Sequence, residues 1–431
     1  MGEAPPSGAQ PASREPTGQK DTVTSGGADL APGEDARQQR KRHRRRVLAW
    51  TSGVLAVILL IAAVSVYLVY RHLNQNVHTG DIAGLTGPQI KDPVPGDQNI
   101  VVVGSDSRAG TRGQYGNPQK YTTAQSDTLM IVHLAASRKW AEVVSIPRDS
   151  WVSIPACKMG NGQTSSPQDF KINEAFSLGA LGGNQASGAA CTIKTLQQNT
   201  GVAINHFVAV NFNGFKDMVN ALGGVPVCTS QTINDPQAHL YLPAGHHMLN
   251  GQEALGYVRA RYSLGNGSDL ERIGRQQAFM SSLASRAKSE LYDPLAIYRF
   301  LDAGTRSVTV DSGFGGIQGL YGLATELRRL PTSKLTFITM PTYPRSEIDP
   351  ADTSNVMWQR PGADQIFASL RDDVPLSTLT GTHAGHASRA GHPRHASPAS
   401  PASPGSAAGG TPSPAPSPAM TTRTGNQSIC T

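Results

Sequence analysis

The feature that most constrains this chain is a run of 24 residues without a charged side chain, Val47–Tyr70. As a helix rising about 1.5 Å per residue it would be roughly 36 Å long, enough to cross a hydrocarbon core of about 30 Å. A secretory signal peptide is the alternative, but the apolar run is too long and no small-residue cleavage site follows it. The sequence therefore predicts a transmembrane helix over 47–70 and excludes a wholly cytosolic protein.

Basic residues flank this run unequally. Seven of the ten residues Arg37–Arg46 are Lys or Arg, whereas only Arg71 and His72 follow the run closely. Such a basic run can also bind nucleic acid, but beside a spanning helix it indicates topology. We therefore expect a single-pass protein of the cell membrane with a cytoplasmic N-terminus and an extracellular C-terminal domain.

The rest of the charge is nearly balanced. Residues 71–375 hold 26 Lys and Arg against 25 Asp and Glu, so six of the seven net positive charges come from the two ends of the chain. A nucleic-acid-binding protein needs a basic face on a folded domain. The balance therefore argues against a nucleic-acid partner.

Composition divides the chain into five parts. Residues 1–46 are polar and rich in Gly, Pro and charge, and residues 376–431 are rich in Pro, Ser and Ala. Neither composition can bury a core, so both are predicted to be disordered tails. Residues 71–98 are predicted to be a juxtamembrane linker between the spanning helix and one extracellular domain, 99–375.

Within that domain, strand and helix patterns alternate. Asn99–Gly104, Thr128–Leu134 and Glu142–Ile146 are apolar runs of the length of a buried strand, and Asp269–Glu290 has helical spacing. Further helices are expected over Ala190–Thr200 and Phe215–Leu222, and further strands over His206–Phe212 and Leu335–Met340. The predicted fold class is α/β, with a central mixed β-sheet flanked by helices.

The chain has four cysteines, and disulfides can form outside the membrane. We favour a Cys157–Cys191 bridge, which would leave Cys228 to pair with Cys430. Four cysteines allow three connectivities, and the sequence does not choose among them. The absence of a CxxC spacing makes a zinc site improbable.

Acidic and arginine residues stand at the ends of the first three predicted strands. Asp106 and Arg108 follow the first strand, Asp127 opens the second, and Arg148 and Asp149 close the third. Ligands of α/β proteins bind at such strand ends, so we expect these side chains to converge on one pocket. Asp106 and Asp127 would suit a hard cation such as Mg²⁺. The alternative is that each Asp only caps a turn.

A second basic group lies further along the chain. Arg259 and Arg261 would point to the same side of an extended segment. On the helix that follows, Asp269, Arg272 and Gln276 form one stripe, with Arg275 at its edge. Basic residues outnumber the two acidic residues between 257 and 289, which favours an anion site over a solvated face stabilised by salt bridges. The motifs of serine hydrolases, P-loop kinases and HExxH metalloproteases are absent.

At these positions the sequence resembles the LytR-CpsA-Psr family of Gram-positive cell-wall proteins. The matching segments are NIVVVGSDSR, SDTLMIVHL, SIPRDSWVSIP, KINEAFSLGA, HFVAVNFNGFKDMVNALGGVPV, LNGQEALGYVRAR and DLERIGRQQ, in the family's order. The resemblance covers about 95–290 and, more weakly, the chain to 375. Many members have Arg two residues before the aspartate of SDT, where this chain has Gln125.

The resemblance implies a phosphotransferase. It would take a glycopolymer from undecaprenyl pyrophosphate and join it through a phosphodiester to a muramic acid hydroxyl of peptidoglycan. Asp106 and Asp127 would hold Mg²⁺, and Arg148, with Asp149 and Asp269 as organisers or bases, would act in the reaction. The remaining polar candidates would bind the pyrophosphate: Arg108, Arg259, Arg261, Arg272, Arg275 and Gln276.

A polyprenyl substrate also needs an apolar channel. We expect it in the strand–helix unit that contains Phe207, Val208, Val210, Phe212, Phe215 and Met218. Ordinary core packing is the alternative for each of these residues. Two other functions also remain open: a polyprenyl-pyrophosphate hydrolase, and a non-enzymatic lipid-binding or regulatory protein.

Overall fold

The computed structural model of the chain describes residues 33–88, 90–105, 125–260, 269–290, 293–306, 308–380 and 422–424. For residues 33–37, 269–271, 294 and 423 it describes the backbone alone. The chain divides into two units, one ending at Leu68 and one beginning at Val69.

The first unit contains most of helix α1, Gly33–Asn76. Within the described residues this is the helix that is long and apolar enough to cross a membrane. It is longer than the predicted helix over 47–70 and includes part of the predicted disordered tail. The physical reason is that Arg, Lys and Gln, which occupy every position of 37–46 except His43, have high helix propensity, so the helix continues through the basic residues.

The second unit is built on an eight-stranded mixed sheet with the order β1-β12-β7-β2-β3-β4-β13-β16. The bounds of its helices and strands are β1 His78–Gly80, β2 Gln98–Ser105, β3 Ser126–Leu134, β4 Ala141–Ile146, β5 Trp151–Ile154, β6 Gln168–Lys171, α2 Asn173–Gly179, α3 Gln185–Thr200, β7 His206–Asn211, α4 Phe212–Ala221, β8 Val225–Thr229, β9 Ile233–Asp235, β10 Leu240–Leu242, β11 Gly245–Leu249, α5 Gly251–Arg259, α6 Asp269–Glu290, α7 Pro294–Thr305, β12 Val308–Asp311, α8 Gly316–Arg329, β13 Leu335–Thr339, β14 Thr342–Pro344, β15 Val356–Trp358, α9 Gly362–Asp372 and β16 Thr422–Thr424.

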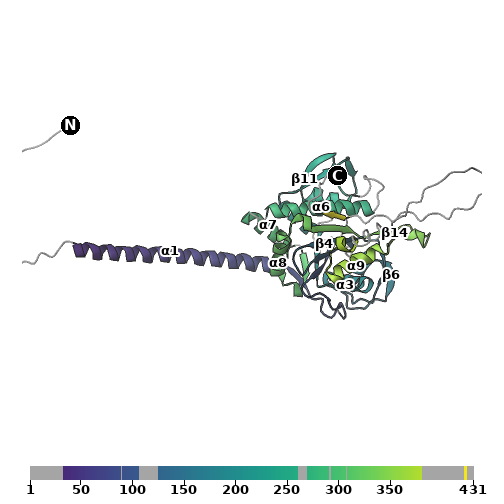
Figure 1. Ribbon diagram of the computed structural model, residues 1–431, viewed down its shortest axis with the longest axis horizontal. Helices are drawn as coiled ribbons and strands as arrows, with labels where there is room; N and C mark the ends of the chain where they lie inside the picture. The colour runs from purple at the N-terminus through teal and green to yellow at the C-terminus, as the bar shows by residue number, and fades with distance from the viewer. Residues whose placement is uncertain are drawn as a thin grey trace, which may run out of the picture. The chain divides into compact units, whose positions relative to one another are not determined.

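The sheet combines parallel and antiparallel pairs, as predicted. β2 is parallel to β7 and β4 is parallel to β13, whereas β3 is antiparallel to both β2 and β4. Helices cover both faces, and Figure 1 shows α6 and α9 on opposite sides of β4. This confirms the predicted fold class.

Two sheet strands come from segments that were predicted to lie outside the domain. β1 belongs to the predicted linker and pairs with β12, and β16 belongs to the predicted disordered tail and pairs with β13. The sequence Thr-Arg-Thr of β16 alternates β-branched residues with a charged one, which suits an edge strand. The predicted limits 99–375 are therefore too narrow for the sheet.

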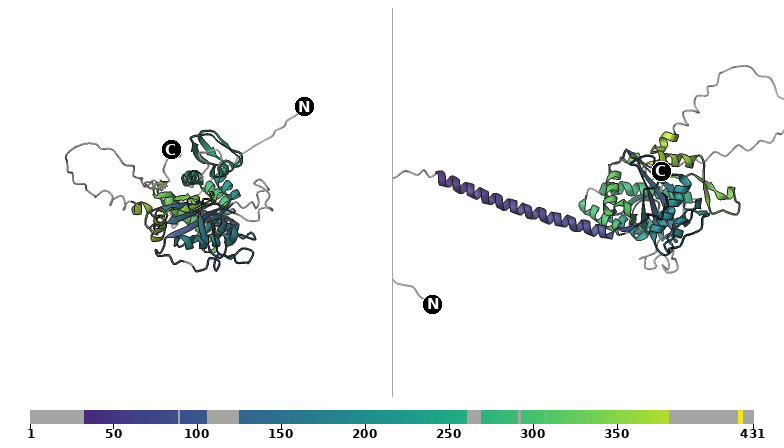
Figure 2. Two further views of the ribbon diagram at one scale, coloured as in Figure 1. Left: turned by 90° about the vertical axis from the view of Figure 1, so that its right-hand side faces the viewer. Right: turned by 90° about the horizontal axis from the view of Figure 1, so that it is seen from below.

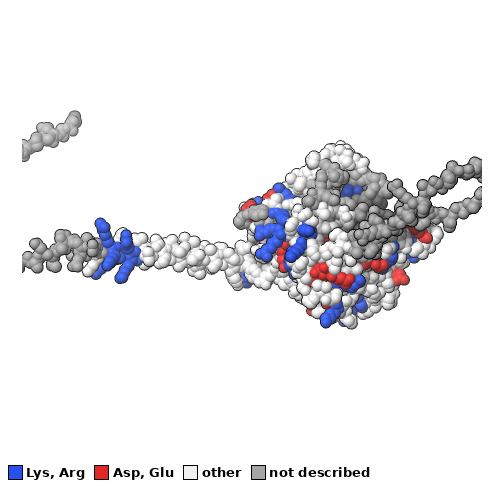
Figure 3. Space-filling model, in the orientation of Figure 1, with Lys and Arg blue, Asp and Glu red and all other residues white. Residues whose placement is uncertain are grey.

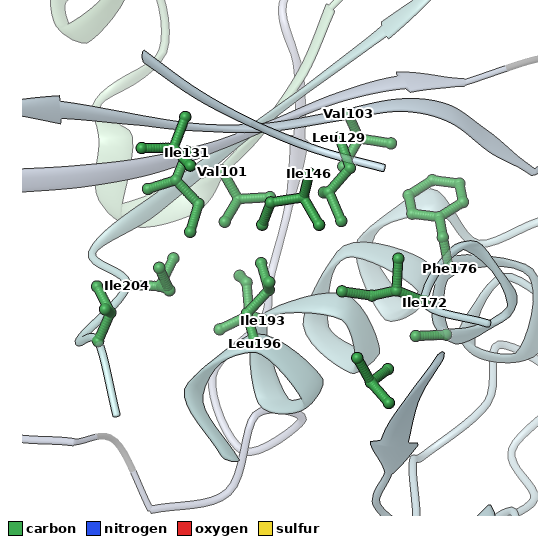
Figure 4. Packing of buried hydrophobic residues seen from close by; sticks show 14 of the residues in the cluster. Val101, Val103, Leu129, Ile131, Ile146, Ile172, Phe176, Ile193, Leu196 and Ile204 are labelled. Carbon is green, nitrogen blue, oxygen red and sulfur yellow. The ribbon is translucent and has the colours of Figure 1, made fainter. Parts of the chain in front are cut away.

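One face of the sheet is closed by α2, α3 and α9. Val101, Val103 and Ile131 point from the strands toward Ile193 and Leu196 of α3, as Figure 4 shows. These five side chains are almost wholly buried. At about 1.5–3 kcal/mol for each buried aliphatic side chain, this layer contributes a large part of the hydrophobic stabilisation of the domain.

The disulfide predicted between Cys157 and Cys191 is confirmed. It joins the segment after β5 to α3, and both cysteines belong to the closed core. Cys228 on β8 is also disulfide-bonded. Its predicted partner, Cys430, lies outside the described residues.

The other face of the sheet supports α6, α7 and α8, and α4 packs on α7. Strands β8 to β11 form two small antiparallel sheets, the hairpin β9–β10 and the pair β8–β11 that encloses it in sequence, and these pack with α5 and α6 around a separate cluster, which includes Val225, Leu240 and Phe279. In Figure 2 these two small sheets stand apart from the large sheet. The space between the large sheet and the two small sheets holds the site described next.

Candidate functional site

The ends of three neighbouring strands bring the first acid–arginine group together. Because β3 is antiparallel to both β2 and β4, the end of β2, the start of β3 and the end of β4 lie at the same edge of the sheet. Arg148 Nη1 donates to Asp127 Oδ1 at 2.8 Å, and Arg148 Nε donates to Asp149 Oδ2 at 3.4 Å. The structure thus brings Asp127, Arg148 and Asp149 together; Asp127 and Arg148 line the cavity described below, whereas Asp149 is not among its lining residues.

The backbone around Arg148 is fixed by two hydrogen bonds. The N–H of Ser150 donates to the carbonyl of Pro147 at 3.1 Å, which closes a turn. The N–H of Asn173, at the start of α2, donates to the carbonyl of Arg148 at 3.2 Å. A guanidinium held by two carboxylates on a fixed turn is preorganised for an anion, since little side-chain entropy remains to be lost on binding.

The second arginine group comes from α5 and α6. Arg259 is the last residue of α5, and its guanidinium carbon lies 4.8 Å from the ring centre of Phe212. Arg272 and Gln276 lie one turn apart on α6, and Arg272 is only 5% exposed. The extended conformation considered for Arg259 and Arg261 does not hold at Arg259, which is helical. The capping box of Asn250 and Glu253 starts a helix that continues to Arg259.

Two side chains of α6 hold the end of α5 in place. Gln276 Nε2 donates to the carbonyl of Val258 at 3.1 Å, and Arg275 donates to the carbonyl of Ala260. Arg275 was predicted to bind pyrophosphate, but it lies outside the cavity lining, and its guanidinium is directed to the backbone that follows α5. Its position at the edge of the stripe turns it away from the arginines that face the cavity.

Residues of both arginine groups line one cavity of about 340 Å³, which lies between the large sheet and the two small sheets. Its polar lining consists of Asp127, Thr128, Arg148, Asn211, Asp235, Gln237, Arg259, Arg272 and Gln276. Its apolar lining consists of Val102, Met130, Val210, Phe212, Phe215, Met218, Ala238, Leu255, Val258, Met280 and Leu283, with Gly104 at the end of β2. Three guanidinium groups against two carboxylates give the polar part a positive balance, beside a wall that suits an alkyl chain.

The predicted channel residues divide between this cavity and the core. Val210, Phe212, Phe215 and Met218 line the cavity, as predicted. Phe207 does not: it is fully buried in the closed core on the opposite face of the sheet. Val208 shares the face of Val210 but lies two residues earlier on β7 and packs in a cluster with Val308 and Val310. Strand alternation separates Phe207 from Val208 and Val210.

Sequence reasoning missed two parts of the wall. Met280 and Leu283 continue the stripe of Arg272 and Gln276 along α6. Counted from Arg272, Gln276 follows after four residues, Met280 after eight and Leu283 after eleven. That helical periodicity is the signal that could have found them. The other part, Asp235, Gln237 and Ala238 of the β9–β10 connection, carries no comparable signal, because its position depends on how the hairpin folds back over the sheet.

Some predicted residues lie outside the described part of the chain. These are Asp106, Arg108 and Arg261, and of Asp269 the structure describes only the backbone that begins α6. Among the described residues no group of three or more His, Cys, Asp or Glu side chains could hold a metal ion. Asp127 faces the cavity with its side chain 26% exposed, so it fits one ligand position of a hard cation.

The LytR_cpsA_psr family model matches residues 71–371 of the chain. The chain is 29% identical over 334 residues to the cell wall biosynthesis protein LcpA of Corynebacterium glutamicum, covering 73% of this chain and 63% of LcpA. It is 30% identical to the probable cell wall biosynthesis protein LcpB of the same organism, covering 74% of this chain and 71% of LcpB.

Two further similarities extend the comparison. The polyisoprenyl-teichoic acid–peptidoglycan teichoic acid transferase TagT of Bacillus subtilis is 29% identical, covering 70% of this chain and 90% of TagT. A solved LytR-Csp2A-Psr enzyme from Actinomyces oris has the same fold, with a TM-score of 0.51, 19% identity, and coverage of 68% of this chain and 96% of its own. The chain belongs to the LytR-CpsA-Psr family of cell-wall proteins.

Proposed function

We propose that this protein transfers a glycopolymer from a polyprenyl-pyrophosphate carrier to a hydroxyl of muramic acid in peptidoglycan. The observation that carries the proposal is the cavity, whose lining combines three arginines and other polar side chains with a larger set of apolar and aromatic ones. A lipid-linked pyrophosphate has the same division into a charged head and a long apolar tail. TagT, one of the relatives, is a transferase of polyisoprenyl-linked teichoic acid to peptidoglycan.

In the proposed reaction the acceptor hydroxyl oxygen attacks the phosphorus that carries the glycopolymer. A new P–O bond to muramic acid forms, the bridging P–O bond of the pyrophosphate breaks, and polyprenyl phosphate leaves with the electron pair. The hydroxyl proton passes to a carboxylate, for which Asp149 and Asp269 are the candidates. Such phosphoryl transfers depend on positioning and on neutralising charge rather than on a covalent intermediate with the protein.

The arginines have separate parts in this scheme. Arg148 stands between Asp127 and Asp149, which fix its orientation toward the cavity. Arg259 is supported by the Phe212 ring, and Arg272 also lines the cavity. Guanidinium groups bind phosphate oxygens in a forked geometry and keep their charge at every physiological pH. We propose that they stabilise the negative charge on the pyrophosphate and on the leaving phosphate.

We propose Mg²⁺ as a cofactor, with Asp127 and Asp106 as the carboxylate ligands. Bound there, the ion would supply positive charge beside the phosphate oxygens. We also propose that the basic residues before Val47 hold the N-terminus in the cytoplasm, so that the cavity lies outside the cell, where peptidoglycan is found. The carrier would be undecaprenyl pyrophosphate.

The proposal can be tested with the full chain, lipid-linked glycopolymer, peptidoglycan and Mg²⁺. We expect a covalent conjugate, and we expect Arg148→Ala to slow its formation about 100-fold or more, as for loss of one group that stabilises transition-state charge. Arg138→Ala is the matched control, because Arg138 follows β3 at the opposite end of the strands and pairs with Glu326 at 3.1 Å.

Three outcomes would count against the proposal. If the Arg148→Ala protein transfers the glycopolymer at the full rate, Arg148 has no role in the reaction. Release of phosphorylated glycan that is never joined to peptidoglycan would favour the hydrolase. Binding of the lipid without turnover at any Mg²⁺ concentration would favour a non-enzymatic lipid-binding protein.

A further inference from the structure

The helices that receive the end of α1 carry an exposed surface that the proposed reaction does not use. Tyr70 is the last residue of the uncharged run, and it belongs to the second unit. Gln318 Nε2 of α8 donates to Tyr70 Oη at 3.3 Å, and His72 Nε2 is 3.0 Å from Asp302 Oδ1 of α7. Whichever way the rest of α1 points, the end of the apolar run is held against α7 and α8.

The contact residue on α7 lies on an exposed stripe. Leu295, Tyr298, Arg299, Asp302 and Arg306 follow a spacing of three or four residues, so they share one face of the helix. Leu295 is 53% exposed, Tyr298 is 36% exposed, and both arginines are exposed. The single acid of this stripe, Asp302, is occupied by His72 and by Arg306 at 2.9 Å.

The contact residue on α8 lies on a similar stripe. Gln318, Tyr321, Arg328 and Arg329 share one face of the helix, and Tyr321 is 60% exposed. The opposite face, with Leu320, Leu323 and Leu327, packs inward. Figure 3 shows Lys and Arg side chains gathered in the region of α7 and α8.

The two stripes therefore combine exposed apolar and aromatic side chains with arginines, next to the point where the uncharged run ends. This is the composition of protein surfaces that lie in the headgroup layer of a bilayer, where the aromatic rings enter the interface and the basic groups meet anionic lipids. Exposed apolar patches with a polar rim usually mark surfaces that bind a membrane or another protein.

We propose that the stripes of α7 and α8 form a membrane-contact surface for anionic phospholipid headgroups. The inference rests on the proposed membrane anchoring by α1 and is separate from the transfer reaction. The surface also lies close to the cavity, because α7 packs on α4. Gly304 of α7 faces Met218 of α4 so closely that an added Cβ at Gly304 would lie 3.6 Å from Met218 Sδ. Met218 lines the cavity, so one helix layer would separate the cavity from the lipid surface.

The test uses spin labels on the full chain in vesicles of phosphatidylcholine and phosphatidylglycerol that contain a nickel-chelating lipid. Labels are placed at Leu295→Cys and Tyr321→Cys, with Ile348→Cys as the matched control, since Ile348 is 62% exposed on the β14–β15 connection. The described native cysteines are disulfide-bonded and would not be labelled. Val57→Cys reports whether α1 itself is in the membrane.

We expect the nickel lipid to enhance relaxation of the labels at 295 and 321 but not at 348. Replacing Arg299, Arg328 and Arg329 by Gln should reduce the enhancement, and so should 1 M salt, which shortens the screening length to about 3 Å. If the relaxation enhancement at 295 and 321 is no larger than at 348 while the label at position 57 lies in lipid, the inference is wrong and the anchoring stands.

If the enhancement at 295 and 321 is the same in vesicles without phosphatidylglycerol, anionic lipid has no role in the contact. If the label at position 57 lies in water, both the anchoring and the inference are wrong.

Discussion

One face of the large sheet is filled and the other is hollow, although neighbouring residues of the same strands form both. Val101 and Val103 of β2 are fully buried against the α3 side, whereas Val102 between them lines the cavity. On β7, Phe207 belongs to the closed core and Val210 to the cavity wall. On β2, β3 and β7 the odd-numbered apolar residues therefore pack in the closed core, whereas Val102, Met130 and Val210 on the other face line the cavity.

The two faces differ in how the elements that cover them pack on the strands, and this difference explains why only one of the faces contains the cavity. The closed face has helices packed directly on the strands and a disulfide that joins two of its parts. The cavity face is covered by the end of α5, by α6 and by the β9–β10 connection, and α6 meets the sheet through a polar contact as well as apolar ones, since Gln277 Nε2 donates to Ser145 Oγ of β4 at 3.3 Å.

The largest expected effect comes from Phe207→Ala on the closed face. Removing a fully buried aromatic side chain should lower the free energy of unfolding by about 3–5 kcal/mol. Val210→Ala, on the same strand but in the cavity wall, should cost about 1 kcal/mol, since the side chain is only partly buried and little new cavity is formed. Denaturant unfolding of both variants measures the difference, and equal losses would contradict the division of the two faces.

Removal of the disulfide by Cys157→Ser with Cys191→Ser should have the next largest effect. The bridge joins cysteines 34 residues apart in the sequence, so its loss should cost about 3–4 kcal/mol in the chain-entropy model. Because the bridge lies in the closed core, the folded variant should still bind polyprenyl pyrophosphate with unchanged affinity. Lost binding in a protein that remains folded would show that the bridge shapes the cavity.

A pH effect is expected at the edge of the closed face, where Asp97 lies near His133 and Asn99. Burial, with the neighbouring Asp92 carboxyl, raises the pKa of Asp97 from 3.8 to about 7. The folded protein therefore keeps a proton that the unfolded chain releases, and this contribution is full below about pH 4 and is lost as the pH rises through about 7.

Asp97→Asn should remove this loss, which we expect to be on the order of 2 kcal/mol between pH 4 and 8. Unfolding midpoints measured across that range would show a flatter profile for the variant. Asp372→Asn is the control, because its side chain is 57% exposed, and its profile should match that of the unchanged protein. A profile that stays as steep in the Asp97 variant would assign the pH dependence to another group.

The smallest effect on stability, and a specific effect on binding, is expected for Met280→Trp. The larger ring would occupy part of the cavity, so the affinity for polyprenyl pyrophosphate should fall about tenfold, or about 1.4 kcal/mol. The free energy of unfolding should change by less than about 1 kcal/mol, because the site offers space. Met248→Trp, at a methionine 53% exposed and outside the cavity lining, should leave the affinity unchanged.

Local sequence patterns predicted the elements well, since they depend on periodicity and composition. The helix Asp269–Glu290 is confirmed with both ends, and the predicted strands at 99–104, 128–134 and 142–146 correspond to β2, β3 and β4. The meeting of Asp127 and Arg148 also followed from sequence, because both stand at ends of apolar strands. The sequence could predict that these strand ends carry charged side chains, but not the distances between the Arg148 guanidinium and the neighbouring carboxylates.

Other parts of the site depend on contacts between distant segments. The sequence placed Phe207 and Val210 in one apolar unit. Strand alternation puts them on opposite faces, and only the packing of the sheet on α3 shows which of the two faces is closed. Arg275 differs from Arg272 by nearly one turn of α6, yet that small change of angle directs it to the carbonyl of Ala260. The β9–β10 wall and the sheet strand β16 come from regions whose local patterns are weak, so tertiary packing alone determines their places.

A structure of the protein with a bound polyprenyl pyrophosphate would test the central claim most directly. The account predicts the diphosphate against the guanidinium groups of Arg148 and Arg259, with the first part of the lipid tail between Phe215 and Met280. A diphosphate bound elsewhere, or a tail that lies outside this cavity while the head occupies it, would contradict the account.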